Sequence, residues 1–326
     1  MEKAVHMRER ATVRGLHLTE LGLGTAQFGN LYRETSEGEV HSAVVEAFAA
    51  GIRYFDTAPH YGLGLSERRL GEQLRGFARE DYVISTKAGR LLDPSPETAH
   101  LQDAEGFVVP AATRRRFDFS RDGVLRSVEA SLDRLGLDYI DIVYLHDPDD
   151  HFEAASTTGI AALIELRDQG TVRAIGAGMN QSHLLAELIR RADVDIVMVA
   201  GRYTLLDQEA AVDLLPTAYE RGVAVVGAGV YNSGLLSRPR PAADAMYDYR
   251  PAPEELLERA KAIAQFCQRH GVSLPDAAIA FPLQHQSVVS VVVGARSGSQ
   301  VIDARDRHRN RPPAALWEDL RAAGLL

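Results

Sequence analysis

Strand and helix patterns alternate along the whole chain, and this alternation restricts the fold more than any other feature. Eight short runs are apolar and mostly rich in β-branched residues; they cover residues 21–25, 53–56, 82–86, 140–145, 172–177, 196–199, 224–228 and 290–293. Runs of this kind are typical of parallel strands that are covered on both faces. Eight such strands, alternating with helices, predict an α/β fold of the (β/α)8 TIM-barrel type.

The helical segments have the period and the end signals of surface helices. They cover residues 40–50, 66–74, 121–135, 160–168, 182–192, 208–221, 254–270 and 275–284, with two more at 300–307 and 314–323 after the last strand. In the third segment Val124, Val128, Leu132 and Leu135 form one apolar stripe, which stops at Gly136. This spacing indicates an amphipathic helix with a glycine at its C-terminal end.

An open, doubly wound sheet is the competing fold. Such a sheet normally carries a G-x-G-x-x-G fingerprint after its first strand. The corresponding segment here contains Gly22 and Gly24, but Gln27 occupies the third glycine position, so the fingerprint fails. No linker or change in composition divides the chain, and we expect one barrel domain over residues 1–326.

Three further segments qualify the barrel prediction. Residues 11–20 have the pattern of a short hairpin before the first barrel strand. Residues 88–119 and 229–253 are expected to be long loops, and loops of this length in a compact domain are usually functional. Both follow strands, which places them at the C-terminal face of the barrel, where the active sites of this fold are built.

The bulk properties exclude several functional classes. The net charge of −9 disfavours a nucleic-acid partner, because phosphate binding needs a clustered basic surface. The basic triplet at 114–116 is interpreted as a solvated loop. Cys267 is the only cysteine, which rules out an internal disulfide or a multi-cysteine metal site. No apolar run is long enough for a membrane span, and the start has no signal-peptide core, so we expect a cytoplasmic protein; the oligomeric state stays open.

Four polar residues end, or closely follow, neighbouring predicted strands: Asp56, Tyr61, Lys87 and His146. A phenol titrates near pH ~10, and a nearby ammonium stabilises its phenolate. A carboxylate beside the lysine keeps that lysine charged, and a histidine orients the substrate oxygen that exchanges a proton with the phenol. The set suits the interconversion of an alcohol and a carbonyl, with the hydride passing to or from a nicotinamide.

Two alternative sites are less well supported. The run from His146 to His151, which contains Asp147, Asp149 and Asp150, has residue types that bind metals. A hydrophilic loop is the preferred interpretation, because His146 already belongs to the proton-transfer set, and we expect no metal. Ser66 is not a nucleophile elbow, since the G-x-S-x-G pattern ends in Arg68.

These residues resemble the aldo-keto reductase family. The resemblance rests on Asp56 and Tyr61, the pair Thr86-Lys87, the segment Leu145-His146-Asp147-Pro148, and two glycine-containing segments at 178–180 and 294–297. It covers nearly the whole chain. It implies a (β/α)8 barrel with an N-terminal hairpin, an NAD(P) cofactor held without a Rossmann fold, and a catalytic tetrad of Asp56, Tyr61, Lys87 and His146.

A narrower resemblance points to one branch of that family. Residues 117–123, 144–149, 201–206 and 231–236 are similar to the branch that contains L-fucose dehydrogenase, D-threo-aldose 1-dehydrogenase and pyridoxal 4-dehydrogenase. This resemblance implies oxidation of an L-fucose-like or D-threo aldose at C1 to the lactone. Oxidation of pyridoxal, reduction of a general carbonyl, and a cofactor-binding regulatory subunit with little turnover remain the alternatives.

The same resemblance implies a cofactor site. It assigns the nicotinamide carboxamide to Asn180, while Ala200 and Ala228 depart from the usual pattern. The start of the helix after the last strand suits a phosphate, because its backbone N–H groups are free. Common phosphate-binding cations are replaced by Gly294 and Gln300, which favours NAD over NADP, although Arg296 has the charge to substitute for them. The complete set of expected cofactor residues is Gly24, Thr25, Asp56, Asn180, Gly229, Gly294, Arg296 and Gln300.

Substrate contacts are expected from loops on the same face. The principal candidates are His60, Phe119, Tyr231 and Asn232, and Phe28, Tyr32 and Asp147 are further ones. Polar and aromatic side chains of this kind suit a sugar and a pyridine ring equally well, so the substrate is a small molecule whose exact identity stays open.

Overall fold

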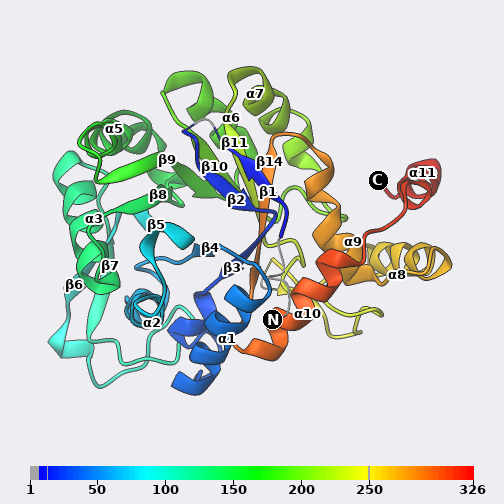
Figure 1. The fold of residues 1–326 in the computed structure, drawn as a ribbon, viewed down its shortest axis with the longest axis horizontal. Coiled ribbons are helices and arrows are strands. Elements are labelled where there is room, and N and C mark those ends of the chain that lie inside the picture. Colours follow the sequence, from blue (N-terminus) through cyan, green and yellow to red (C-terminus); the bar gives the residue numbers. More distant parts are fainter. Residues whose placement is uncertain (1–6, 13, 249) are drawn as a thin grey trace.

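The strands close into a barrel. The computed structural model describes residues 7–12, 14–248 and 250–326. Eight strands form a closed parallel sheet in the order β10-β11-β14-β3-β4-β5-β8-β9 (Figure 1). Their bounds are β3 (Leu21–Gly24), β4 (Tyr54–Asp56), β5 (Val83–Ala88), β8 (Ile140–His146), β9 (Val172–Met179), β10 (Ile196–Ala200), β11 (Ala224–Ala228) and β14 (Val288–Gly294). These are the eight predicted runs, and the (β/α)8 prediction is confirmed.

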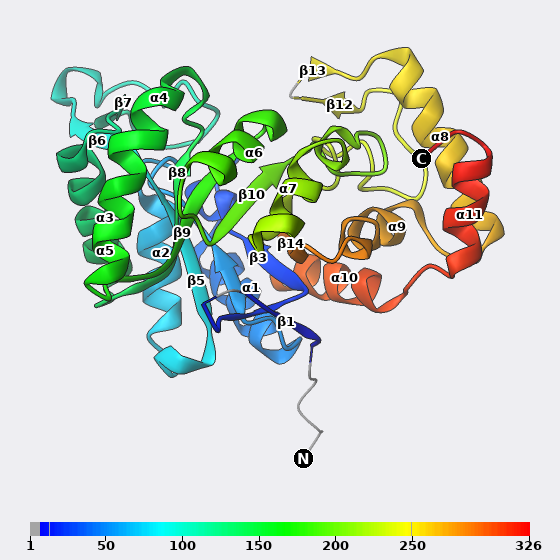
Figure 2. The ribbon, with the colours of Figure 1, turned by 90° about the horizontal axis from the view of Figure 1, so that it is seen from above.

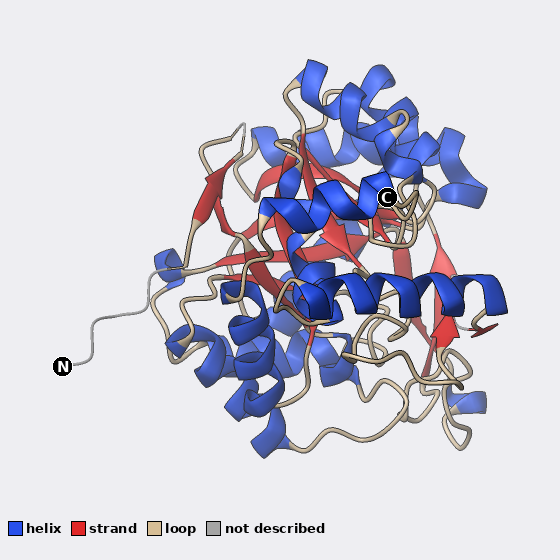
Figure 3. Cartoon of the chain, turned by 90° about the vertical axis from the view of Figure 1, so that its right-hand side faces the viewer, coloured by secondary structure: helices blue, strands red, loops and turns tan. Residues whose placement is uncertain are grey.

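Helices surround the barrel (Figure 3). They are α1 (Glu37–Ala49), α2 (Leu65–Leu74), α3 (Arg121–Leu135), α4 (Phe152–Ala154), α5 (Ile160–Asp168), α6 (Ser182–Arg191), α7 (Leu214–Arg221), α8 (Glu254–Arg269), α9 (Leu274–Ala280), α10 (Gly298–Arg309) and α11 (Ala314–Ala322). Their ends follow local chemistry: a capping box of Ser36 and Glu39 begins α1, and Gly136 in the left-handed conformation ends α3. Among the residues that the structure describes, no helix combines the length and the apolar character needed to cross a lipid bilayer.

An N-terminal hairpin closes one end of the barrel. Strands β1 (Glu9–Ala11) and β2 (His17–Thr19) pair antiparallel, which confirms the predicted hairpin apart from its starting residue. Leu16 and Leu18 from this hairpin are fully buried in the cluster that fills the barrel interior. The next residue after β2, Glu20, is also buried and is neutralised by Arg10 and Arg311. Apolar contacts and a buried ion cluster therefore seal the end opposite the strand C-termini.

The two long segments lie at the other end of the barrel (Figure 2). Residues 88–119 contain the antiparallel pair β6 (Arg90–Pro94) and β7 (Thr113–Phe117), and residues 229–253 contain β12 (Met246–Tyr247) and β13 (Arg250–Pro251). The long loop expected over residues 88–119 therefore contains a strand pair, and the interpretation of the basic triplet as a solvated loop was wrong. Arg115 of the triplet lies in β7 and forms an ion pair with Asp103 at 2.5 Å. Both hairpins extend the face at which the strands end.

Candidate active site

The four predicted catalytic residues meet at the C-terminal ends of the strands. Asp56 is the last residue of β4, Lys87 lies in β5, and His146 is the last residue of β8. The Lys87 Nζ donates to Asp56 Oδ2 at 2.7 Å and to the Tyr61 hydroxyl at 3.2 Å. The His146 ring stands perpendicular to the Tyr61 ring, with 6.1 Å between the centroids. Strand order alone places these groups together, because β4, β5 and β8 are neighbours in the sheet.

The local charges set the protonation states of the lysine and the histidine. Burial opposes the charge of Lys87, but Asp56 and Tyr61 beside it raise the Lys87 pKa above its ordinary value, and the ammonium is retained. Burial, followed by the charges of Arg90 and Lys87, holds the pKa of His146 well below its usual value. His146 is therefore neutral, and a neutral imidazole donates or accepts a hydrogen bond without adding charge to the site.

The phenol differs from the sequence-based expectation. Burial raises the pKa of Tyr61 above its ordinary value, and the nearby charge of Lys87 lowers it only in part. The charge of Lys87 does lower the pKa of Tyr61, as expected. Burial raises that pKa by more, so the net shift is upward and the phenol is not made acidic. The phenol is protonated at neutral pH, which suits it to donate a proton to a carbonyl oxygen.

A chain of buried hydroxyl groups supports Asp56 from inside the barrel. Ser85 Oγ donates to Asp56 Oδ1 at 2.7 Å, and the Tyr54 hydroxyl lies 2.9 Å from Ser85 Oγ. The Tyr144 hydroxyl follows at 3.3 Å from that of Tyr54. Because the carboxylate only accepts, each hydroxyl must donate toward Asp56, and a chain aligned in this way strengthens each of its bonds.

This chain gives a testable prediction. Ser85→Ala removes the donor to Asp56 and leaves the Tyr54 hydroxyl without its acceptor in a dry interior. We expect a loss of about 1–3 kcal/mol in the free energy of unfolding, measured by urea denaturation. Tyr54→Phe breaks the chain one step further from Asp56 and is expected to cost less. Equal losses in both variants would show that Asp56 does not depend on Ser85.

The predicted cofactor residues lie at or just beyond the C-terminal ends of β3, β4, β9, β11 and β14, and at the start of α10. Gly24 ends β3 and pairs with Gly294, which ends β14, and β14 in turn pairs with β11. A Cβ atom at Gly294 would stand 2.6 Å from the Gln27 side chain, so a larger residue there would crowd this edge. Thr25 is fully buried, and its hydroxyl donates to the backbone oxygen of Asp56 at 2.8 Å, so that it holds the catalytic strand in place.

Two asparagines converge beyond β9 and β11. Asn180 Nδ2 donates to the carbonyl of Ala200 at 2.9 Å, and Asn232 Nδ2 donates to that of Gly201 at 3.2 Å. The Oδ1 atom of Asn232 is buried and accepts no hydrogen bond within the described part of the chain. A buried acceptor without a partner fits the amide N–H₂ of a carboxamide, as nicotinamide carries. Gly229, with φ of +62°, lets the chain turn between the end of β11 and Asn232.

The start of α10 has the features of a phosphate site. Ser297 is the N-cap residue, but its side chain accepts no hydrogen bond from a backbone N–H of the first turn, and the N–H of Gly298 donates to Ser42 Oγ at 3.1 Å. Gln300 instead accepts from the backbone N–H of Arg296 at 2.8 Å. The Arg296 guanidinium is largely buried and donates to the Leu31 and Arg33 carbonyls and the Thr35 hydroxyl. It joins α10 to the segment before α1 and does not extend toward the N-terminus of α10, contrary to the expectation that it substitutes for a missing phosphate-binding cation.

The predicted substrate residues separate into two groups. His60 lies beside the tetrad, with its ring centroid 5.6 Å from that of His146. Phe119 is only 3% exposed and packs beneath Phe117, and it is Phe117 that lines the adjoining cleft. Tyr231 is packed between two apolar clusters on the β11 side, next to Asn232. The structure therefore brings His60 to the four predicted catalytic residues and places Tyr231 and Asn232 beside the predicted cofactor residues.

Sequence reasoning missed Arg90. This arginine is the first residue of β6, donates to His60 Nδ1 at 3.3 Å and forms an ion pair with Asp147. Together with Asp147 and Asn180 it lines a cleft of about 300 Å³ next to the tetrad. One feature of the sequence could have indicated Arg90: it lies three residues after Lys87, just past the end of the strand that carries this lysine.

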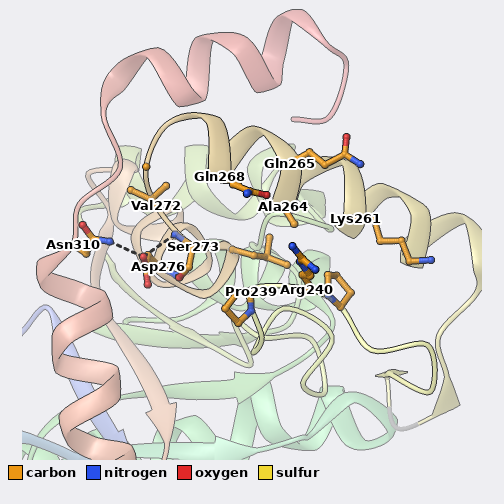
Figure 4. Close-up of a pocket in the computed structure, with 13 residues that line it drawn as sticks. Pro239, Arg240, Lys261, Ala264, Gln265, Gln268, Val272, Ser273, Asp276 and Asn310 are labelled. Atoms are coloured by element: carbon orange, nitrogen blue, oxygen red, sulfur yellow. Dashed lines mark hydrogen bonds between the residues drawn. The ribbon is translucent and has the colours of Figure 1, made fainter.

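A separate cavity lies away from these groups. It has a volume of about 990 Å³ and is formed between α8, the start of α9 and residues 239–241 (Figure 4). None of the four tetrad residues lines it. A large volume is not by itself evidence of a catalytic site. The smaller cleft beside His146 is therefore the candidate for substrate binding.

Known proteins resemble this chain over nearly its full length. The sequence pattern of the Aldo/keto reductase family matches residues 20–305. A D-threo-aldose 1-dehydrogenase from Pseudomonas sp. is 46% identical, with 97% of each chain covered, and a pyridoxal 4-dehydrogenase from Microbacterium luteolum is 38% identical, with 96% of each covered. The structure of an aldo-keto reductase from Bacillus halodurans in its holo form superposes with a TM-score of 0.73 at 28% identity, covering 95% of this chain and 93% of its own. The chain is an oxidoreductase that belongs to the aldo/keto reductase family.

Proposed function

We propose that the protein oxidises an L-fucose-like or D-threo aldose at C1 to the lactone, with NAD as the hydride acceptor. The observation that carries the proposal is the contact of the Tyr61 hydroxyl with Lys87 Nζ at 3.2 Å, beside the neutral His146. The relative named D-threo-aldose 1-dehydrogenase, 46% identical over 319 residues, supports the choice of an aldose. Aldo/keto reductases use NAD(P)H, and bound nicotinamide supplies the hydride acceptor.

The tetrad residues have separate roles in this proposal. Tyr61 removes the proton from the anomeric hydroxyl as the C1 hydride leaves. Lys87, held charged by Asp56, stabilises the phenolate form of Tyr61 that accepts this proton. His146 binds the same substrate oxygen through Nε2 and fixes its orientation toward the phenol. Burial excludes water from this set, since Asp56 and Lys87 are each 3% exposed.

The preference for NAD rests on charge. The NADP 2′-phosphate needs a free cation near the start of α10, and the Arg296 guanidinium already donates to three oxygens of residues 31–35. The unpaired Asn232 Oδ1 fits the carboxamide, and the N-terminus of α10, which has no side-chain cap from Ser297, fits the pyrophosphate; both cofactors share these groups.

One assay tests this function. The absorbance of reduced nicotinamide is followed with L-fucose, L-galactose, D-arabinose and pyridoxal, each with NAD and with NADP. We expect rapid reduction of NAD by at least one aldose and slower reduction of NADP. Turnover of pyridoxal alone would reassign the substrate to that of the 38% identical relative. Tight cofactor binding without turnover of any of the four would favour the regulatory interpretation.

A further inference from the structure

An ion pair stands at the rim of the tetrad. Arg90 donates to Asp147 Oδ2, and the same oxygen lies 3.6 Å from His146 Nε2. The Arg90 side chain is 13% exposed, whereas that of Asp147 is 36% exposed and faces the cleft of about 300 Å³. The pair thus has a covered cation and an accessible carboxylate next to the proposed reacting oxygen.

The backbone is arranged to bring these two side chains together. Gly89, with φ of +94°, turns the chain from β5 into β6, and a Cβ atom there would collide with the Phe119 ring. Arg90 then lies over the Phe117 ring, 4.8 Å from its centroid. Asp147 has φ of +40°, a left-handed conformation that is uncommon outside glycine. Its backbone N–H donates to the Gly178 carbonyl at 2.9 Å, which holds this strained residue in place. Strain of this kind is characteristic of functional sites.

The contact with Arg90 determines which nitrogen of His60 donates a hydrogen bond and which accepts one. Arg90 donates to His60 Nδ1, so a neutral His60 must carry its proton on Nε2. Burial, with the charges of Arg90, Arg115 and Lys87, lowers the pKa of His60 to about 2, which makes the ring neutral. The cleft therefore presents an accepting carboxylate at Asp147, with the donating Nε2 of His60 and the neutral ring of His146 beside it.

The cleft has an excess of negative charge. Asp147, Asp149 and Asp150 line it, opposed by Arg90, and Arg90 is already paired with Asp147. An anionic ligand such as a sugar phosphate would meet like charges here, whereas hydroxyl groups would find acceptors. This charge selects neutral polyhydroxylated molecules.

We propose that Asp147, held by Arg90, binds the hydroxyl group on the carbon next to the reacting carbon of an unphosphorylated sugar. The proposal rests on the function proposed above and adds to it a residue that recognises one hydroxyl group of the substrate. A sugar whose reacting oxygen is bound by His146 places its neighbouring hydroxyl within reach of the carboxylate, since Asp147 Oδ2 is 3.6 Å from the histidine nitrogen. A site built to accept from a hydroxyl rejects the analogue that lacks it, because its polar group is then left unpaired.

The test compares D-arabinose with 2-deoxy-D-ribose, which differ only in the hydroxyl at C2. We expect the wild-type enzyme to favour D-arabinose by about 10- to 100-fold in kcat/KM, as befits a hydrogen bond to a charged group. Asp147→Gly removes the side chain and suits the left-handed backbone, so it is expected to fold. It should lower kcat/KM for D-arabinose by at least about tenfold more than that for 2-deoxy-D-ribose, so that the preference between the two sugars is lost. D-arabinose 5-phosphate should be a poorer substrate than D-arabinose.

Two further variants complete the experiment. Asp147→Asn keeps the shape of the side chain and should give an intermediate preference. Asp122→Asn makes the same change on an exposed turn of α3, where the side chain is 85% exposed, and should leave the preference unchanged. A preference that survives in Asp147→Gly would overturn the subsite while leaving the proposed function intact. Failure of the wild-type enzyme to oxidise any aldose would overturn both.

Discussion

Replacing Tyr61 with phenylalanine is expected to lower kcat/KM for aldose oxidation by about 10²- to 10⁴-fold, the usual contribution of a positioned proton-transfer group. The change removes only the hydroxyl that contacts Lys87 Nζ at 3.2 Å and keeps the ring that packs against Phe107. Cofactor affinity should stay nearly intact, because the proposed cofactor contacts lie on other strands. Steady-state kinetics and titration with reduced nicotinamide measure the two effects separately.

The pH dependence of aldose oxidation is a second test of the role of Tyr61. Burial raises the pKa of Tyr61, so the phenolate needed for oxidation is scarce at neutral pH. Oxidation by the wild-type enzyme should rise by about tenfold per pH unit through the alkaline range, and this rise should be absent from the residual activity of Tyr61→Phe. Tyr219→Phe, on the exposed surface of α7, is the matched control. Wild-type-like turnover in Tyr61→Phe would refute the tetrad assignment.

The barrel was predictable because its signals are local. Parallel strands covered on both faces appear as short apolar runs, and all eight runs became barrel strands. The predicted strand over residues 140–145 became β8, which ends one residue later at His146. Since strand ends gather at one face of a barrel, the sequence order of Asp56, Lys87 and His146 was enough to predict their proximity.

The hairpin β6–β7 was not predictable in the same way. Its strands mix polar and apolar residues without a clear alternation, and their pairing is held by contacts between residues distant in sequence, such as that of Arg116 with Asp93. The helical segment before α5 was also missed, where the chain is helical from Phe152 through a π-helical stretch at Ala155–Gly159. Glycine and threonine in that stretch have low helix propensity, and contacts such as that of Thr158 Oγ1 with the Phe119 carbonyl decide its structure.

The support of Asp56 shows a similar limit. Tyr54 lies two residues before Asp56 on the same strand, so both side chains point into the barrel. The sequence indicates that much, but not that Ser85 of β5 pairs with Asp56 and links the two. Register between strands depends on closure of the whole barrel, and a single sequence carries no direct record of it.

Removing the charge of Lys87 is expected to reduce both activity and stability. Lys87→Met leaves the buried carboxylate of Asp56, 2.7 Å from the lost ammonium, without its cation. Breaking one partner of a buried ion pair costs about 3–5 kcal/mol, to be measured by urea denaturation.

A double variant separates the structural from the catalytic role of this pair. Asp56→Asn combined with Lys87→Met removes both charges, and replacing a buried pair by neutral residues of similar size is often close to neutral in stability. We therefore expect the double variant to regain most of the unfolding free energy lost in Lys87→Met while its kcat/KM stays low, since neither charge is left to stabilise the phenolate of Tyr61. A double variant as unstable as Lys87→Met would mean that the two charges do not depend on each other. Recovery of activity together with stability would instead remove Lys87 from the catalytic set and leave it only the role of holding Asp56 and Thr57, whose carbonyl it binds at 2.9 Å.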